Sequence, residues 1–263
     1  MTAARYSPVS KESIAGNMDT SFFKVLALLL MFIDHIGASL LPGIPELRVV
    51  GRMAFPLYAW CLVVGSVKTS SPWRYILRLL LLAVISQPLY MMALNHTWTD
   101  MNILFTLAIA LTAIQGIRAK WMGSQFWVPV LCYLALGYLN VDYGWKGVTF
   151  ILLLYFARES RSGLFAAYMA YALYWGASSS SVRSLFGIPL SFTQLPGIGQ
   201  LLSALFKLQG MVWLSLPLIL IDTKTNVKLP KWFGYSLYPL HLVVLIVLKL
   251  MNGATFAMLL IGF

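Results

Sequence analysis

Charged side chains are scarce in this chain. Only 10% of its 263 residues are Asp, Glu, Lys or Arg, whereas 60% are hydrophobic and the mean hydropathy is +0.80. A soluble domain carries roughly 25% charged residues, so the composition excludes an ordinary soluble protein. Apolar runs with short polar breaks fill almost the whole length and leave no room for a separate soluble domain. The sequence therefore predicts an integral membrane protein.

Cysteine is scarce as well, with Cys61 and Cys132 the two in the chain. Both fall in apolar runs and are interpreted as small hydrophobic side chains, so we expect neither a disulfide framework nor thiol chemistry. No Cys/His cluster has ligand spacing, and no metal site is predicted. Acidic residues number 8 against 19 Lys and Arg, for a net charge of +11. Because these basic residues are spread among loops and form no stripe, a nucleic-acid partner is not expected.

Apolar runs of helical length indicate the fold class. They lie at about residues 22–41, 49–67, 76–94, 102–117, 126–140, 147–157, 163–175, 185–206, 209–221 and 233–250. Roughly 20 apolar residues cross a bilayer core as a helix, so the shorter runs are expected to be tilted or re-entrant. We predict an all-α polytopic bundle of eight to ten transmembrane helices. Residues 22–263 would form this single domain, preceded by a short polar segment over residues 1–21.

The distribution of Lys and Arg predicts the orientation of the bundle. Short cytoplasmic loops of membrane proteins carry an excess of these residues. With the N-terminus inside, ten basic residues flank the inner side: Arg5, Lys11, Lys24, Lys68, Arg74, Arg78, Arg118, Lys120, Arg158 and Arg161. The outer flanks up to residue 196 hold three, namely Arg48, Lys146 and Arg183. We therefore expect a cytoplasmic N-terminus.

An acid and a histidine stand side by side inside the first apolar run, FFKVLALLLMFIDHIGASLL. Ionisable groups within a membrane are costly, so Asp34 and His35 predict a functional site that faces the bundle interior. A polar pair that holds two helices together is the alternative. Consecutive helical residues point about 100° apart, so the two are not expected to face each other. His35 suits proton transfer from an amine or hydroxyl, while Asp34 either serves the chemistry or neutralises Arg52.

Further polar residues fall in the outer half of the predicted membrane. Arg52, in GRMAFPLYAW, can hold an oxyanion or a phosphate, or it can extend to the interface. Asn102 can cap its helix or point into the site. Asp142 and Tyr143 belong to the turn DYGWKG, and a second intramembrane histidine, His241, is either a site residue or a packed one. This convergence favours a site over scattered interhelical contacts.

The loop ALNHTWTD holds the remaining histidine, His96, which we interpret as an ordinary exposed residue. Between residues 176 and 210, the SSSS run together with Pro189 and Pro196 breaks helical continuity, and the helix count there is the hardest to assign.

Six segments of the chain, taken in order, resemble the TraX family: KVLALLLMFIDHIGA, GRMAFPLYAW, LLAVISQPLY, NILFTL, YGWKGV and YPLHLVVL. The likeness runs from about residue 22 to 248. The namesake of the family is a membrane protein that acetylates the N-terminus of pilin. The family is similar to a larger clan of membrane acyltransferases, which includes the acyltransferase-3 proteins and heparan glucosaminide acetyltransferase. In that clan a histidine within a membrane helix is catalytic, and cytoplasmic acyl-CoA supplies the acyl group.

The resemblance implies a multi-pass acetyltransferase of a bacterial-type cytoplasmic membrane, surrounded by lipid and using acetyl-CoA as co-substrate. It gives His35 the catalytic position, and Asp34 is predicted from the residues alone to share the catalytic site. The resemblance implies Arg52, Asn102, Asp142 and Tyr143 as substrate and oxyanion residues, and His241 joins them as an intramembrane histidine. On the cytoplasmic face, the phosphates of acetyl-CoA are expected to meet Lys68, Arg74 and Arg78.

The acceptor is left open between a pilin-like N-terminus and an envelope glycan or another envelope acceptor. Two functions of other classes also remain open. One is a proton-coupled transporter, in which the acid and the two intramembrane histidines form a relay. The other is a non-enzymatic assembly factor that holds a pilin-like helix.

Overall fold

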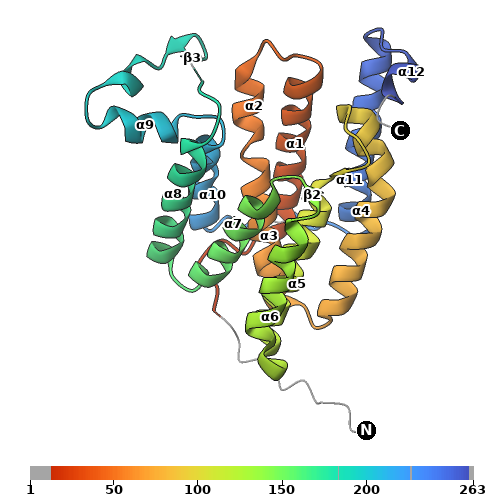
Figure 1. Cartoon of the computed structure of the whole chain (residues 1–263), viewed down its shortest axis with the longest axis vertical. Helices are drawn as coiled ribbons and strands as arrows, with labels where there is room; N and C mark the ends of the chain where they lie inside the picture. Colours follow the sequence, from red (N-terminus) through yellow and green to blue (C-terminus); the bar gives the residue numbers. More distant parts are fainter. Residues whose placement is uncertain (1–12, 183, 226, 261–263) are drawn as a thin grey trace.

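The computed structural model describes residues 13–182, 184–225 and 227–260, and consists mainly of helices that run back and forth between two ends (Figure 1). The α-helices are α1 (Thr20–Ser39), α2 (Pro45–Gly51), α3 (Ala54–Lys68), α4 (Pro72–Leu94), α5 (Ile103–Ala119), α6 (Ser124–Leu136), α7 (Gly144–Ala157), α8 (Arg161–Ala177), α9 (Gly199–Leu205), α10 (Leu216–Leu220), α11 (Lys231–Met251) and α12 (Phe256–Leu259). Short 3-10 helices are η1 (Trp121–Gly123), η2 (Ser191–Gln194) and η3 (Gly210–Ser215).

The strands that the structure describes are pairs of two residues. β1 (Asp100–Met101) pairs in parallel with β2 (Asn140–Val141), and β3 (Ser184–Leu185) pairs antiparallel with β4 (Ile188–Pro189). The mainly helical prediction is confirmed.

Three helical segments within the described residues are long and apolar enough to cross a membrane. They are Thr20–Ser39, Pro45–Lys68 and Pro72–Leu94. Shorter apolar helices follow at Ile103–Ala119, Trp121–Leu136, Gly144–Ala157, Gly210–Leu220 and Ser236–Met251. Eight to ten crossings and a cytoplasmic N-terminus stay predictions. Figure 1 places the loops after α3, α5 and α7 at the end where α1 begins, so the basic residues that flank these loops share one end of the bundle: Lys68, Arg118, Lys120, Arg158 and Arg161. Arg5 and Lys11 lie outside the described residues.

Helix α3 forms the centre of the bundle. Its residues Leu57, Ala59, Trp60 and Val63 are fully buried. Helices α1, α5 and α7 pack around it. The outward faces of α4 and α6 expose apolar side chains instead, among them Leu81, Val84, Ile85, Val130, Leu131 and Leu134. Helices that are apolar on both their inner and outer faces are typical of a bundle surrounded by lipid.

The second predicted helix is broken at residues 52 and 53. The run at residues 49–67 does not form one helix: α2 starts at Pro45, and Arg52 lies at its C-terminal cap, between α2 and α3. Pro56 has no backbone N–H to donate to the Arg52 carbonyl, so the hydrogen-bonded ladder is interrupted at this point. The break leaves the Arg52 side chain inside the bundle, with 8% of the residue exposed.

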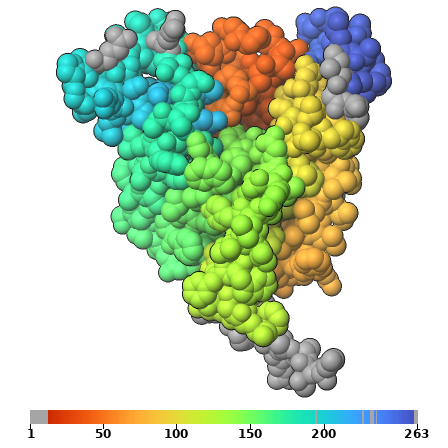
Figure 2. All heavy atoms as spheres, viewed as in Figure 1, coloured from red at the N-terminus to blue at the C-terminus, as the bar shows by residue number. Residues whose placement is uncertain are grey.

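The apolar run at residues 185–206 does not form one helix. It folds into the β3–β4 hairpin, η2 and the short helix α9. Gly187 and Gly197 both have positive φ, of 78° and 77°, and Pro189 and Pro196 cannot donate helical hydrogen bonds. Figure 2 shows this segment on one side of the end opposite the N-terminus, with α1 and α2 rising between it and the C-terminal part of α11.

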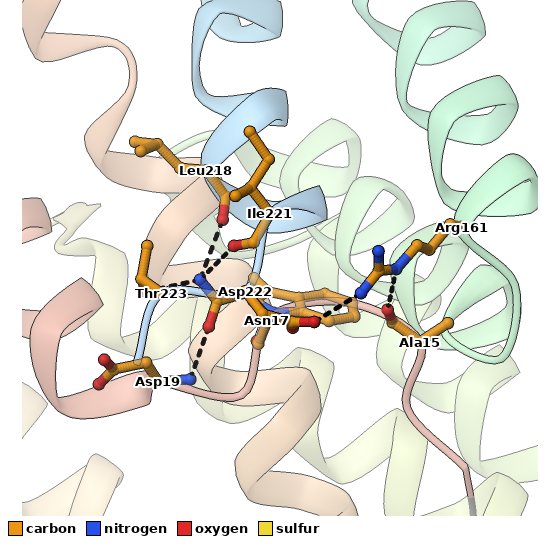
Figure 3. Close-up of polar contacts among 9 residues, drawn as sticks. Ala15, Asn17, Asp19, Arg161, Leu218, Ile221, Asp222 and Thr223 are labelled. Atoms are coloured by element: carbon orange, nitrogen blue, oxygen red, sulfur yellow. Dashed lines mark hydrogen bonds and ion pairs between the residues drawn. The ribbon is translucent and has the colours of Figure 1, made fainter. Parts of the chain in front are cut away.

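The end of the predicted N-terminal segment joins the bundle. The Asn17 side chain donates hydrogen bonds to the carbonyls of Leu218 and Ile221 and to the hydroxyl of Thr223, at 3.3, 2.7 and 2.7 Å (Figure 3). The Trp60 indole N–H donates to the Asn17 carbonyl at 2.6 Å. Residues 13–19 therefore tie the start of α1, at Thr20, to the chain after α10, while residues 1–12 lie outside the described range.

Candidate functional site

The acid of the first helix pairs with two arginines of the next segment. Asp34 is buried, and its Oδ2 lies 3.1 Å from Arg48 Nη1 while its Oδ1 lies 3.5 Å from Arg52 Nε. The two helices approach closely here because Gly51 has no side chain: an added Cβ would overlap the Asp34 backbone and Cβ. The predicted pairing of Asp34 with Arg52 is confirmed. Arg48, assigned to an outer flank by charge counting, is a partner that sequence reasoning missed.

His35 faces a different neighbour from Asp34, as their helical positions predicted. Its imidazole stacks on that of His241 in α11, with ring centroids 5.3 Å apart and an interplanar angle of 26°. His35 Nδ1 has no hydrogen-bond partner among the described residues, whereas the His241 ring lies against the backbone of Leu237 and Tyr238. Two imidazoles from α1 and α11 thus meet inside the bundle, and that of His35 has a ring nitrogen without a partner. The structure brings together the two intramembrane histidines that the sequence singled out.

The DYG turn reaches the same place from the other side of α3. The β1–β2 pairing and a hydrogen bond from the Thr106 hydroxyl to the Asp142 carbonyl hold the turn. Tyr143 has a positive φ of 62° and stacks on Phe55, with ring centroids 4.3 Å apart. Its hydroxyl accepts a hydrogen bond from Arg52 Nη1 at 3.0 Å. Burial raises the pKa of Asp142 to about 6, an increase that Arg52 partly opposes.

These groups line a cavity of about 330 Å³, which we call the histidine cavity. Its lining includes Asp34, His35, Arg48, Arg52, Asp142 and Tyr143. His96 lines it too, so the loop residue interpreted as exposed, whose side chain is 39% exposed, also borders the cavity. The His96 ring stacks on Tyr90, with centroids 4.9 Å apart, and its Nδ1 lies 3.5 Å from Asp100. The loop that carries His96 leads into β1, and the pairing of β1 with β2 holds this loop beside the cavity. The polar composition of the loop did not predict this pairing.

Two predicted site residues do not line this cavity. Asn102 caps α5, since its Oδ1 accepts from the Leu104 N–H at 3.0 Å. Its Nδ2 donates to the Ala83 carbonyl and to Gln87 Oε1, so both amide protons are used. Of the two roles left open for Asn102, the structure has the cap. His241 stands behind His35 and is 6% exposed, outside the cavity lining.

A second cavity, of about 600 Å³, opens near the end where α1 begins, and we call it the basic cavity. Its lining includes four basic residues, Lys24, Lys68, Arg74 and Arg78. Apolar side chains of α3, α4 and α5 line its deeper part, among them Leu62, Leu79 and Leu107. The three basic residues predicted to meet phosphates are therefore brought together at one cavity.

The two cavities have two lining residues in common, Tyr58 of α3 and Tyr238 of α11. Tyr58 lies ten residues before Lys68 on the same helix, about 15 Å along its axis. Sequence reasoning missed both tyrosines, because an aromatic residue in an apolar run carries no local signal. Among the described residues, no group of three or more His, Cys, Asp or Glu could hold a metal ion.

Comparison with known proteins assigns the family. The TraX protein family model matches residues 19–249. The chain belongs to the TraX family. A relative named probable fimbrial assembly protein FimC, serogroup H1, from Dichelobacter nodosus is 31% identical over 210 residues, which cover 73% of this chain and 85% of that protein. The uncharacterized protein RP591 of Rickettsia prowazekii is 28% identical over 54% of this chain and 56% of its own length. No solved structure matches the chain.

The TraX match covers the whole of the bundle from the start of α1 to the last turns of α11. Both cavities and the stacked histidines His35 and His241 therefore lie within the matched range. The resemblance stated from six short segments is confirmed.

Proposed function

We propose that this TraX family member is a membrane acetyltransferase that moves an acetyl group from cytoplasmic acetyl-CoA to an amine or hydroxyl at the opposite face. The observation that carries the proposal is the pair of cavities that meet at Tyr58 and Tyr238. One cavity offers cations to a polyanionic head group, and the other offers an imidazole with unpartnered nitrogen. This division suits a reaction whose donor and acceptor arrive from different sides.

Binding of the donor would use the basic cavity. The side chains of Lys68, Arg74 and Arg78 would meet the phosphates, where their clustered positive charge raises the local concentration of an anion. The apolar lining beyond them fits the long uncharged arm of CoA. The thioester at the tip of that arm would reach the tyrosines between the cavities.

His35 would act as general base in the histidine cavity. Its ring would accept the proton of the attacking amine or hydroxyl and later return it to the departing thiolate, so one group serves both halves of the transfer. Asp34 is engaged with Arg48 and Arg52, so its role is to fix these two arginines beside the cavity. Arg52 in turn orients Tyr143 through their hydrogen bond, which shapes the wall that an acceptor would meet.

The name of the Dichelobacter nodosus relative suggests the class of acceptor. A fimbrial subunit, like any polypeptide with an unmodified N-terminus, offers an N-terminal amine, and a neutral amine is a competent nucleophile toward a thioester. We therefore propose a fimbrial or pilin-like N-terminus as the acceptor to test first, with envelope glycan hydroxyls as the second class.

The test is ligand stabilisation combined with label transfer. Purified protein in detergent is melted with and without acetyl-CoA, and a ligand at 100 times its dissociation constant should stabilise by about 2.7 kcal/mol. Membranes are then incubated with acetyl-labelled CoA and a peptide that carries a pilin-like N-terminus. Stabilisation with transfer of label supports the proposal. Neither stabilisation nor transfer to amine or hydroxyl acceptors would instead favour a transporter or an assembly factor.

A further inference from the structure

A buried tyrosine without a partner stands between the two cavities. Tyr238 is 5% exposed, and among the described residues no group forms a hydrogen bond with its hydroxyl. Other buried tyrosines are satisfied: Tyr168 donates to the Val212 carbonyl at 2.8 Å, and Tyr143 accepts from Arg52. A buried hydroxyl left unpaired is destabilising, so such groups in proteins are usually hydrogen-bonded. The position of Tyr238 suggests that its partner is a ligand.

The surroundings of Tyr238 place it next to the histidines. His241 follows it by three residues on α11, so the two side chains share a helix face, with ring centroids 5.1 Å apart. His241 stacks on His35. Tyr58 of α3 lines both cavities as well. A ligand that lies beside Tyr238, where the two cavities meet, is therefore close to the histidine pair.

Two other predicted donors are directed toward other groups. Both amide protons of Asn102 are donated, to Ala83 and Gln87. The Arg52 guanidinium donates through Nη1 to Tyr143, and its Nε faces Asp34. Neither residue stands at the junction of the two cavities, where a thioester arriving from the basic cavity would first meet His35.

We propose that the Tyr238 hydroxyl donates a hydrogen bond to the carbonyl oxygen of the thioester and stabilises the oxyanion formed there. This inference rests on the proposed function. The acceptor's lone pair forms a bond to the carbonyl carbon, the C=O π electrons move to oxygen beside Tyr238, and the acceptor proton passes to His35. When the carbonyl re-forms, the carbon–sulfur bond breaks and the thiolate takes the proton back from His35. No oxidant or further reactant is needed.

The test measures both the acetyl-transfer activity and the melting temperature of two Tyr→Phe variants. Tyr238→Phe should lower kcat by about 100- to 1000-fold, the loss typical of a single oxyanion donor. Its KM for acetyl-CoA should stay near that of the unchanged protein, and its melting temperature should stay the same or rise, because it removes an unpaired hydroxyl. Tyr168→Phe should do the opposite: it removes two hydrogen-bond partners away from both cavities, so the melting temperature falls and kcat is kept.

A second measurement separates an oxyanion donor from a residue that only shapes the passage. A trifluoromethyl ketone analogue of acetyl-CoA hydrates to a tetrahedral adduct that mimics the intermediate. Tyr238→Phe should weaken binding of this analogue by the same factor as it lowers kcat/KM, and leave binding of CoA unchanged.

Several outcomes overturn the assignment. A Tyr238→Phe variant that keeps kcat, that loses analogue and CoA affinity equally, or that fails to fold assigns the hydroxyl to packing or to the passage. In these cases the unchanged protein still transfers acetyl groups, so the proposed function stands. Absence of both transfer and acetyl-CoA stabilisation in the unchanged protein would overturn the function and the role of Tyr238 together.

Discussion

Replacing His35 by Gln should separate activity from stability more clearly than any other single change in this bundle. Glutamine retains most of the volume and a polar end, but it cannot act as a base near neutral pH. A general base contributes typically 10²- to 10⁴-fold to a rate, which corresponds to about 3–5 kcal/mol of activation free energy. We expect a loss of kcat in this range for acetyl transfer.

The structure limits the accompanying loss of stability. The aromatic contact of His35 is the stack on His241, and such pairs contribute about 0.5–1.5 kcal/mol beyond their buried area. No hydrogen bond to Nδ1 is lost, because that atom has no partner among the described residues. The free energy of unfolding should therefore change by about 1 kcal/mol, well below the change in activation free energy.

The assay measures turnover of acetyl-labelled CoA in membranes and thermal melting of the purified variant in detergent. His96→Gln is the matched control, because His96 lines the same cavity but stacks on Tyr90 and not on His241. The control should show no comparable fall in kcat. In the unchanged protein, kcat/KM should also rise with pH as His35 loses its proton. Retention of more than about a tenth of the activity in His35→Gln, or a stability loss as large as the activity loss, would refute the assignment of His35 as base.

Three further changes test other parts of the site. Arg74→Gln combined with Arg78→Gln should raise KM for acetyl-CoA with little effect on kcat, because contacts to the remote phosphates stabilise the ground state and the transition state equally. The control is Lys120→Gln, at the same end of the bundle but outside the cavity lining. An unchanged KM in the double variant would place the head group elsewhere. Because burial raises the pKa of Asp142 from 3.8 to about 6, its ionisation destabilises the fold as pH rises through this window. At pH 8, Asp142→Asn should therefore raise the free energy of unfolding by up to about 3 kcal/mol, and the melting temperature with it. At pH 4, it should leave both unchanged. Gly51→Ala should lower both the melting temperature and kcat, because its Cβ would force α2 away from α1; a variant that matches the unchanged protein in both would contradict the close packing.

Part of this site could be predicted from the sequence because ionisable residues are rare in apolar helices. Asp34, His35 and His241 stand out against their neighbours, and a charged group within lipid must find a partner or a cavity. The 100° separation of consecutive helical residues correctly assigned Asp34 and His35 to different neighbours. Such predictions can be made from the sequence because a helix fixes the direction in which each of its side chains points.

The remainder depends on contacts between distant segments. Arg48 was placed on an outer flank because charge counting treats every basic residue near a loop alike, whereas Gly51 lets α2 approach α1 until Arg48 reaches the buried acid. The β1–β2 pairing that brings His96 over the cavity joins two loops 40 residues apart. Prolines and glycines in the run at residues 185–206 predicted an interruption of the helix. Composition alone did not predict the hairpin and short helices that replace it.

The separation of the two cavities would let the bundle act on groups from both sides of a membrane without conducting ions. Under the proposed function, the charges of the donor stay at Lys68, Arg74 and Arg78, while those of the acceptor side stay at the Asp34 cluster. Between them the two cavities share Tyr58 and Tyr238, and apolar side chains such as Leu62, Leu79 and Leu107 line the basic cavity beside its cations. Moving an ion into such an apolar environment is strongly unfavourable. The uncharged thioester arm carries no such penalty, because its carbonyl can be satisfied by one donor. A tyrosine hydroxyl where the two cavities meet would therefore donate a hydrogen bond to the uncharged carbonyl, and it would stabilise the negative charge that develops on the carbonyl oxygen.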